Sequence, residues 1–225
     1  MKLSLEQTDT RPDYDRLLRL GMPEFVYAES KTPDQVVKSL RALFKTHKAC
    51  LAYRATQAQF RAVKKSIKSA QFNALARIIR CGKMSQNLAG KVVVVSGGTS
   101  DVPVVAEAVE VLEFLGCKVR TLQDVGVSGI HRLQKRLSIF SDAQVTIVVA
   151  GMEGSLPTVI AGFVKLPIIA VPTSVGFGAN LGGITTLLSM LTSCAPGVAV
   201  VNVNNGVGAA LASYRILNTF KREGA

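Results

Sequence analysis

VVAGMEGSLPTV, residues 148–159, is an apolar run that breaks into small residues at its downstream end. Three later stretches repeat this design: IIAVPTSVGFGANLGG (168–183), LTSCAPG (191–197) and VVNVNNGVGAA (200–210). Short apolar runs of this kind are typical of buried strands, and small residues after them let backbone N–H groups approach a ligand. The pattern predicts an α/β sheet with a ligand site where the carboxyl ends of the strands meet.

The same alternation of strand and helix patterns begins at Lys91 and gives five βα units. The strands are predicted in VVVVS, KVRTL, VTIVVA, IIAVP and VAVVNV, and the helices over 103–115, 131–140, a segment from 156, 184–191 and 208–220. Near-continuous apolar strands between helices indicate a parallel sheet covered on both faces. We therefore predict a flavodoxin-like three-layer sandwich over residues 89–225.

Residues 1–88 are predicted to form a separate, small, basic domain. Residues 1–90 contain 17 Lys and Arg against 7 Asp and Glu, whereas residues 91–225 contain 10 against 8. Apolar spacing over 33–44 and 55–79 indicates helices, so this domain is expected to be mainly helical. Its lysines at 64, 65 and 68 have no interleaved aromatic residues and are interpreted as a solvated face, so we expect no nucleic-acid binding.

Composition excludes several classes of protein. The four cysteines and two histidines show no spacing typical of a zinc site. The N-terminal stretch is polar and unlike a signal peptide, and no apolar run reaches membrane-spanning length. We expect a cytoplasmic protein with reduced thiols and no membrane association.

The loop SGGTSDVP (96–103) follows the first strand of the sheet and opens a helix. Small side chains and N–H groups at a helix start suit a phosphate. The loop has neither the lysine of a Walker loop nor a GxGxxG spacing, and a helix cap made by Ser100 or Asp101 is an equally simple interpretation.

Several of these motifs resemble the aminoimidazole ribonucleotide (AIR) carboxylase superfamily. Gly97 to Pro103 is similar to its phosphate loop, Gly-Ser-x-Ser-Asp, and His131-Arg132 is similar to its second-loop pair. Residues 151–154, 171–183 and 191–197 resemble one branch more closely, the carboxylases of nickel-pincer nucleotide biosynthesis.

The N-terminal part resembles that branch too. The positions that carry this similarity are Asp15, Arg16, Arg19, Gly21, Pro23, Glu24, Val26, Tyr27 and Lys31-Thr32-Pro33. The chain departs from the usual pattern at three positions: Gly98 stands in place of Ser, Asn204 in place of Asp, and Phe177 in place of a frequent Tyr.

The resemblance implies a reaction on nicotinic acid adenine dinucleotide. C5 of the pyridinium ring is carboxylated with bicarbonate or CO2, and the phosphoanhydride is hydrolysed. The products are pyridinium-3,5-biscarboxylic acid mononucleotide and AMP, the first step of nickel-pincer nucleotide biosynthesis. Magnesium is a candidate cofactor, no tightly bound organic cofactor is expected, and the chain is expected to form a homo-oligomer, an octamer by resemblance.

The resemblance also assigns roles to residues. A pyridinium ring is electron-poor, so a nucleophile must add to it before C5 can attack CO2; a thiolate suits this step, and Cys194 would supply it. Glu153 would then take the C5 proton as a general base. The expected substrate and phosphate contacts are Gly97, Gly98, Thr99, Ser100, Asp101, His131, Arg132, Gly151, Thr173, Ser174, Gly176, Gly178 and Asn205.

The residues alone leave other interpretations open. Cys50, Cys81 and Cys117 are interpreted as small buried side chains, and only Cys194 lies among loop residues. Glu153 would equally serve as a carboxylate that accepts backbone N–H groups. Arg132 would equally pair with Asp124, and His131 is more often structural than catalytic at such a position.

Two other functions compete with this one. A purine-pathway AIR carboxylase or mutase acts on a carbon that is already nucleophilic and needs no thiol. A non-enzymatic nucleotide-binding module would use the same loops, with Cys194 and Glu153 dispensable.

Overall fold

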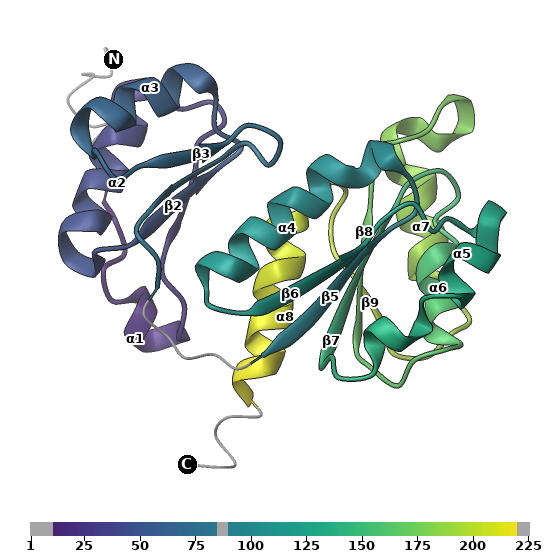
Figure 1. Cartoon of the computed structure of the whole chain (residues 1–225). Coiled ribbons are helices and arrows are strands. Elements are labelled where there is room, and N and C mark those ends of the chain that lie inside the picture. The colour runs from purple at the N-terminus through teal and green to yellow at the C-terminus, as the bar shows by residue number, and fades with distance from the viewer. Residues whose placement is uncertain (1–10, 85–89, 220–225) are drawn as a thin grey trace, which may run out of the picture. The chain divides into compact units, whose positions relative to one another are not determined.

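The computed structural model describes residues 11–84 and 90–219, which fall into two compact units, residues 1–85 and 86–225 (Figure 1). The predicted domain boundary between residues 88 and 89 lies outside the described residues. No helix within the described ranges is long and apolar enough to cross a membrane.

The second unit is built on the predicted parallel sheet. Its strands are β5 (Lys91–Ser96), β6 (Lys118–Leu122), β7 (Val145–Ala150), β8 (Ile168–Pro172) and β9 (Val198–Val200), in the order β6-β5-β7-β8-β9. All neighbouring strands pair in parallel. The chain moves from β5 outward to β6 and then crosses to β7 on the other side, so the strand order reverses between β5 and β7. In such sheets this reversal opens a crevice for ligands.

Helices cover both faces of this sheet, which confirms the predicted three layers. Helices α4 (Val102–Phe114) and α8 (Gly206–Thr219) pack together on one face, and α5 (Ile130–Gln134), α6 (Leu156–Ala161) and α7 (Ile184–Leu191) lie on the other (Figure 1). The 3-10 helices are η2 (Thr99–Asp101), η3 (Val127–Gly129), η4 (Leu137–Phe140) and η5 (Gly178–Gly183). The helix predicted over 131–140 is therefore split into α5 and η4, because Arg136 leaves the helical region (φ −122°, ψ 13°).

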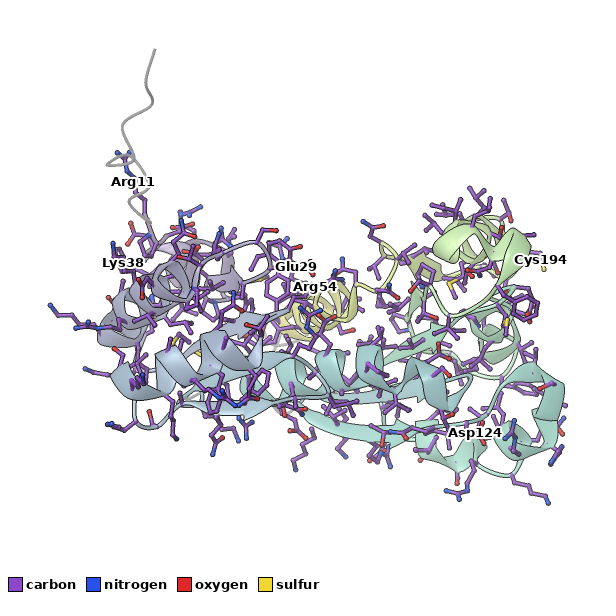
Figure 2. All side chains as sticks on the ribbon, turned by 90° about the horizontal axis from the view of Figure 1, so that it is seen from above. Arg11, Glu29, Lys38, Arg54, Asp124 and Cys194 are labelled. Carbon is purple, nitrogen blue, oxygen red and sulfur yellow. The ribbon has the colours of Figure 1, made fainter. Side chains whose placement is uncertain are left out.

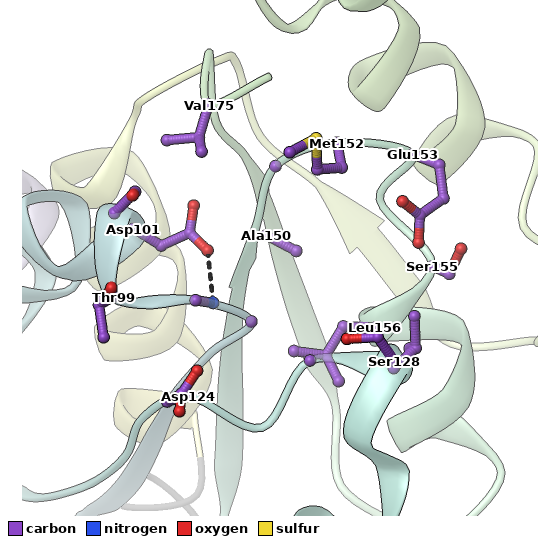
Figure 3. A pocket seen from close by; sticks show the side chains of 16 residues that line it. Thr99, Asp101, Asp124, Ser128, Ala150, Met152, Glu153, Ser155, Leu156 and Val175 are labelled. Carbon is purple, nitrogen blue, oxygen red and sulfur yellow. Dashed lines mark hydrogen bonds between the residues drawn. The ribbon is translucent and has the colours of Figure 1, made fainter. Parts of the chain in front are cut away.

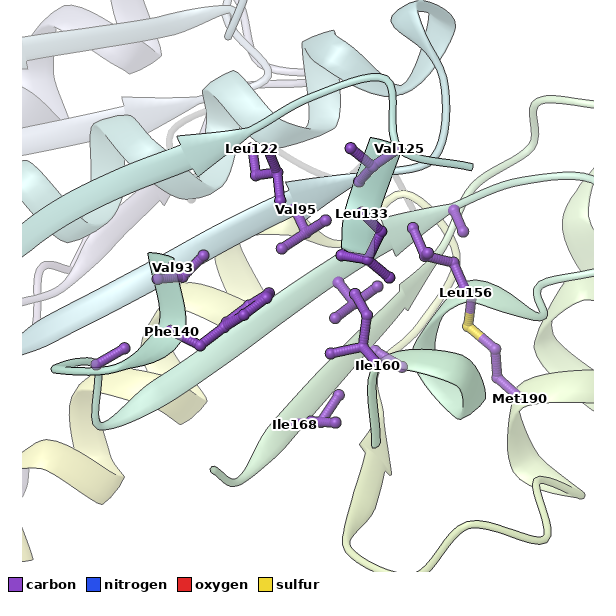
Figure 4. Packing of buried hydrophobic residues seen from close by; sticks show 14 residues of the cluster. Val93, Val95, Leu122, Val125, Leu133, Phe140, Leu156, Ile160, Ile168 and Met190 are labelled. Atoms are coloured by element: carbon purple, nitrogen blue, oxygen red, sulfur yellow. The ribbon is translucent and has the colours of Figure 1, made fainter. Parts of the chain in front are cut away.

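The core on the α5–α6–α7 side holds these layers together. Val93 and Val95 of β5 meet Leu133 of α5, Ile160 of α6 and Met190 of α7 in one buried cluster (Figure 4). Burying an aliphatic side chain of this size contributes roughly 1.5–3 kcal/mol. Strand β7 is buried at all six residues, as expected for a central strand between two helical layers.

The first unit contains helices, as predicted, and in addition a four-stranded sheet that the sequence did not predict. Its sheet has the order β1-β2-β4-β3, with β1 (Phe25–Tyr27), β2 (Cys50–Tyr53), β3 (Gln71–Asn73) and β4 (Ile78–Cys81). Its helices are α1 (Arg16–Leu20), α2 (Pro33–His47) and α3 (Gln57–Ser66). Thr32 and Gln35 form a capping box at the start of α2, with Pro33 in the first turn.

The single helix predicted over 55–79 is wrong beyond Ser66. Ile67 takes an extended conformation (φ −122°, ψ 96°), and β3 and β4 then form an antiparallel hairpin. The Asn73 side chain accepts hydrogen bonds from the N–H groups of Leu75 and Ala76, at 3.0 and 3.1 Å. Such an Asx turn reverses the chain where a helix would continue.

Candidate active site

A pocket of about 450 Å³ lies at the carboxyl ends of β5 and β7, where the strand order reverses (Figure 3). Its walls come from the segments after β5 (97–101) and after β6 (124 and 126–128), from the end of β7 and the connection into α6 (150–153, 155 and 156), and from Val175 in the loop after β8. A volume of this size is typical of a small-molecule site. The predicted ligand edge of the sheet therefore carries a pocket.

The loop after β5 presents donors at the start of a helix. The N–H of Gly97 is bonded to Val149 O (3.0 Å) and that of Gly98 to Asp101 Oδ2 (2.9 Å). Thr99 and Ser100 are exposed, and their N–H groups find no acceptor within the described part of the chain. These two residues lead through η2 into α4, so their N–H groups lie at the positive end of a helix dipole. Of the predicted phosphate contacts, Thr99 and Ser100 therefore have the geometry of anion donors.

Asp101 is buried below this loop, with 3% of its surface exposed. Its Oδ2 accepts the Gly98 N–H, and its Oδ1 accepts the Thr173 hydroxyl at 2.8 Å. Burial raises the pKa of Asp101, while the bonds from Gly98 and Thr173 act in the opposite direction. The carboxylate thus joins the loops after β5 and β8. It does not cap α4 through its side chain, and Thr173 is fully buried behind it.

Glu153 lies in a tight turn after β7, and its side chain is exposed at the pocket. Met152 and Gly154 on either side of it have left-handed φ angles of 50° and 71°. The Met152 carbonyl accepts hydrogen bonds from the Asn180 amide (3.0 Å) and the Thr186 hydroxyl (2.5 Å). Glu153 itself is exposed at the pocket, close to Ser155, and has no hydrogen-bond or ion-pair partner within the described residues (Figure 3). Its carboxylate is therefore available to a ligand.

Gly151 allows the β7 loop to pass close to the β8 loop. A Cβ at position 151 would lie 2.3 Å from Val175 O and 2.7 Å from Thr173 Oγ1. The N–H of Met152 is bonded to the same Val175 carbonyl at 2.7 Å. Gly151, a predicted contact residue, lines the pocket, and its lack of a side chain lets the loops after β7 and β8 pack together.

Arg132 reaches the site through an acidic neighbour. Its Nη1 donates to Asp124 Oδ2 at 2.5 Å, and Asp124 lines both the main pocket and a smaller one of about 320 Å³ that contains Arg132. The Arg132 Nε is buried without a hydrogen-bond partner within the described residues. The ion pair between Arg132 and Asp124, one of the two interpretations that the sequence left open, is therefore present. His131 is exposed and does not line the pocket.

Four other predicted contact residues lie outside this lining. Ser174 is bonded to Asn204: Ser174 N–H donates to Asn204 Oδ1, and Asn204 Nδ2 donates to Ser174 Oγ, both at 2.9 Å. Asn205 accepts the Gly208 N–H (2.8 Å) in the first turn of α8. Gly176 packs against the Asn180 side chain, and Gly178 begins η5. Their roles as ligand contacts stay predictions.

Cys194 lies in the loop between α7 and β9, at the outer surface of the unit (Figure 2). All four cysteines fall in the described residues, and Cys194 is exposed while Cys50, Cys81 and Cys117 are buried, as predicted. Cys194 does not line the pocket of the single chain. The preceding residue, Ser193, is bonded to Thr158 of α6 at 2.7 Å, so this loop is attached beside the β7–α6 connection.

Sequence reasoning missed the contribution of the loop after β6. Asp124, Gly126 and Ser128 line the pocket but were not predicted as site residues. The Gly126 N–H donates to Gly97 O at 2.8 Å, and a Cβ at 126 would lie 2.9 Å from that oxygen. The signal was present, since QDVGVSG directly follows a predicted strand.

The donor set of the site does not form a metal centre. Within residues 11–84 and 90–219, no three His, Cys, Asp or Glu side chains come together to hold a metal ion. Both Asp101 oxygens are bonded, and Asp124 is paired with Arg132. These residues do not fit a magnesium ion held by the protein alone.

Comparisons with known proteins agree with this architecture. Residues 91–224 match the family model described as AIR carboxylase, and residues 6–83 match the LarB/PurE-like N-terminal domain. An uncharacterized protein of Methanocaldococcus jannaschii is 40% identical over 210 residues, which cover 88% of this chain and 79% of that protein. The N5-carboxyaminoimidazole ribonucleotide mutase of the same organism is 33% identical over 129 residues, covering 55% of this chain and 76% of the mutase.

A solved structure shares the fold of the C-terminal part. The crystal structure of Treponema denticola PurE has a TM-score of 0.50 and 21% sequence identity, covering 60% of this chain and 84% of PurE. The parallel sheet, the pocket at its reversal point and both family matches lead to one assignment. The chain belongs to the AIR carboxylase family and carries a LarB/PurE-like N-terminal domain, which confirms the predicted family.

Proposed function

We propose that this protein carboxylates C5 of the pyridinium ring of nicotinic acid adenine dinucleotide and hydrolyses its phosphoanhydride. The products are pyridinium-3,5-biscarboxylic acid mononucleotide and AMP, as in the first step of nickel-pincer nucleotide biosynthesis. The observation that carries this proposal is the exposed Cys194 thiol in an AIR carboxylase family chain that also has a LarB/PurE-like N-terminal domain. Carboxylation of an aminoimidazole needs no thiol, whereas carboxylation of a pyridinium ring does.

The carboxylation is balanced without an oxidant or a reductant. The Cys194 thiolate forms a C–S bond to a ring carbon next to C5, and the ring loses its positive charge. The enamine-like C5 then forms a C–C bond to CO2. Glu153 accepts the C5 proton, the C–S bond breaks, and the departing thiolate restores the aromatic pyridinium. The absence of a hydrogen-bond or ion-pair partner for Glu153 within the described residues supports its role as the base.

The phosphates have a separate set of partners in this proposal. Thr99 and Ser100 present N–H groups and hydroxyls at the start of η2 and α4, where an anion is favoured. In the complex, the Arg132 guanidinium leaves Asp124 and donates to phosphate oxygens instead. A guanidinium group binds phosphate and carboxylate oxygens with the same two-pronged geometry. Water attacks the phosphoanhydride, and AMP leaves.

Self-association is the second part of the proposal. The exposed residues Ile184, Leu188 and Leu191 form one face of α7, with Leu181 and Phe177 beside them, at 48–82% exposure. Apolar patches of this kind are typical of protein interfaces. We propose that another copy of the chain covers this face, and that Cys194, just beyond α7, serves the pocket of that copy. The number of copies, eight by resemblance, and the cytoplasmic location remain expectations.

A purine-pathway AIR carboxylase or mutase reaction is the alternative. It is favoured by one observation: Glu153 lines the pocket of the single chain, but none of the four cysteines does. The activity named for the 33% identical mutase relative belongs to the same class.

The decisive experiment incubates the purified protein with nicotinic acid adenine dinucleotide, bicarbonate and magnesium. AMP and the carboxylated mononucleotide are followed by mass spectrometry. We expect product from the wild type and from the Cys117→Ala control, and none from Cys194→Ala. Equal product from Cys194→Ala would rule out the thiol as nucleophile, and turnover of an aminoimidazole ribonucleotide instead would support the alternative.

Mixing variants tests whether copies share a site. Cys194→Ala and Glu153→Gln are each expected to be inactive, and refolding them together should restore activity if one copy supplies the thiol and another the carboxylate. Activity that stays absent in the mixture would place both groups in one chain. Light scattering of Leu188→Glu should show smaller assemblies than the wild type.

A further inference from the structure

The N-terminal unit contains a pocket that the proposed reaction does not use. Its volume is about 390 Å³, within the range of small-molecule sites. Its lining includes Phe25 to Tyr27 of β1 and two buried residues of α2, Ser39 and Leu43. The pocket is therefore a depression between a strand and a helix of one unit.

Three cationic side chains line this pocket: Arg11, Arg16 and Lys31. Lys31 is half-buried, and neither it nor Arg11 has a carboxylate partner within the described residues. Among the described residues Glu24 is the one acidic residue in the lining, and its carboxylate accepts the backbone N–H of Asp13 at 2.6 Å. The lining therefore has an excess of positive charge.

Asp13 does not remove this excess, because two guanidinium groups share it. Arg16 Nε donates to Asp13 Oδ2 at 3.2 Å, and Arg19 donates to the same oxygen at 2.5 Å. Arg16 has no second carboxylate partner within the described residues, so its terminal nitrogens can turn toward an anion.

Hydrogen bonds hold the backbone at Lys31 in place. Gln59, which is 4% exposed, donates its amide to the carbonyls of Ala28 and Lys31, both at 2.8 Å. The Lys31 N–H also donates to Ala28 O at 3.1 Å. The buried Gln59 side chain therefore fixes the backbone from which the Lys31 side chain reaches the pocket.

The pocket also accounts for a motif that the proposed reaction leaves unexplained. Arg16, Glu24, Val26, Tyr27 and Lys31 all belong to the N-terminal stretch that carries the family resemblance, and all line the pocket. We propose that this pocket binds a phosphorylated anion of the size of a nucleoside monophosphate. Arg16 and Lys31 hold the phosphate, since guanidinium and ammonium groups bind its oxygens strongly, and Phe25 and Tyr27 provide an apolar wall for the remainder. This inference does not depend on the proposed reaction.

Calorimetric titration of the full chain with AMP tests the proposal, with hydrogen–deuterium exchange to locate the ligand. We expect AMP to slow exchange over residues 11–31, and Lys31→Met to weaken that binding about tenfold or more. Lys31→Arg should retain it. Lys38→Met is the matched control, because Lys38 is an exposed lysine of α2 outside the pocket, and it should bind as the wild type does (Figure 2).

The two sites are distinguished by location. Protection confined to residues 97–101, or equal affinity of Lys31→Met and wild type, would overturn the N-terminal site without touching the proposed reaction. If AMP slows hydrogen exchange over residues 11–31 in a protein that does not carboxylate the dinucleotide, the N-terminal site is supported and only the proposed reaction fails. Adenosine, which lacks the phosphate, should bind at least about tenfold more weakly than AMP, and equal binding would overturn the role of Arg16 and Lys31.

Discussion

Replacing Thr173 by valine preserves the shape of the side chain but removes its hydrogen bond to the buried Asp101 carboxylate, together with the long bond (3.4 Å) that its hydroxyl accepts from the Val175 N–H. Thr173 is fully buried, and Asp101, whose Oδ1 its hydroxyl contacts at 2.8 Å, is 3% exposed. A hydrogen bond to a charged group contributes about 1.5–3 kcal/mol. We expect the free energy of unfolding of the C-terminal unit to fall by about this amount at neutral pH, and Tm to fall by about 5–9 °C.

A matched control is available in the neighbouring strand β7. Thr146 is also fully buried, but its hydroxyl has no hydrogen-bond partner within the described residues. Thr146→Val should therefore be neutral or stabilising, because it removes an unsatisfied polar group. Native-state hydrogen exchange of the β5 amides measures both variants. Equal losses of stability in Thr173→Val and Thr146→Val would refute the reasoning, since the hydrogen bond to Asp101 would then contribute nothing.

The same pair predicts a pH dependence. Burial raises the pKa of Asp101 in the folded protein, so folding takes up a proton between the ordinary pKa and the raised one. Stability should therefore fall as the pH rises through that interval, and Asp101→Asn should lack this fall. Because the Thr173 hydroxyl stabilises the ionised form, Thr173→Val raises the pKa of Asp101 further. Its loss of stability is largest above that pKa and shrinks on acidification.

Three further predictions concern single residues. Iodoacetamide should alkylate Cys194 in the folded protein and add only one group per chain by mass, because the other three cysteines are buried; rapid labelling of several would contradict this. Gly151→Ala should cost more than about 2 kcal/mol, because its Cβ would lie 2.3 Å from a carbonyl oxygen, whereas Gly162→Ala, with 3.3 Å, should cost less than about 1 kcal/mol in urea unfolding. Asn204→Asp should change stability by less than about 1 kcal/mol, because a carboxylate still accepts the Ser174 N–H, and the Ser174 hydroxyl, which now accepts from the Asn204 amide, would instead donate to it; a larger loss would show that the amide donor matters.

The sheet of the C-terminal unit could be predicted because its signal is local. Strands such as β5 and β7 are almost wholly buried, so nearly every residue in them is apolar. The hairpin β3–β4 could not be predicted in this way. Phe72, Leu75 and Ile79 have helical spacing, and the deciding feature was the single side chain of Asn73, which turns the chain.

The site could be predicted only in part, for a similar reason. The loops that line the pocket follow from the positions of the strand ends, which the sequence indicates. The pairing of Asp101 with Thr173 joins residues 72 apart, and no local pattern predicts it. Cys194 stands out by its surroundings in the sequence, but its position relative to the pocket depends on how α7 and its flanking loops pack.

The turn that carries Glu153 has a consequence for how this family can diversify. The Met152 carbonyl of this turn accepts hydrogen bonds from the Asn180 and Thr186 side chains, and neither of these residues lines the pocket. A substitution at position 180 or 186 would therefore move the Glu153 carboxylate without replacing any residue of the pocket lining. Differences in ligand preference can thus arise from residues outside the pocket lining, and a mutational scan limited to that lining would overlook the two side chains that position Glu153.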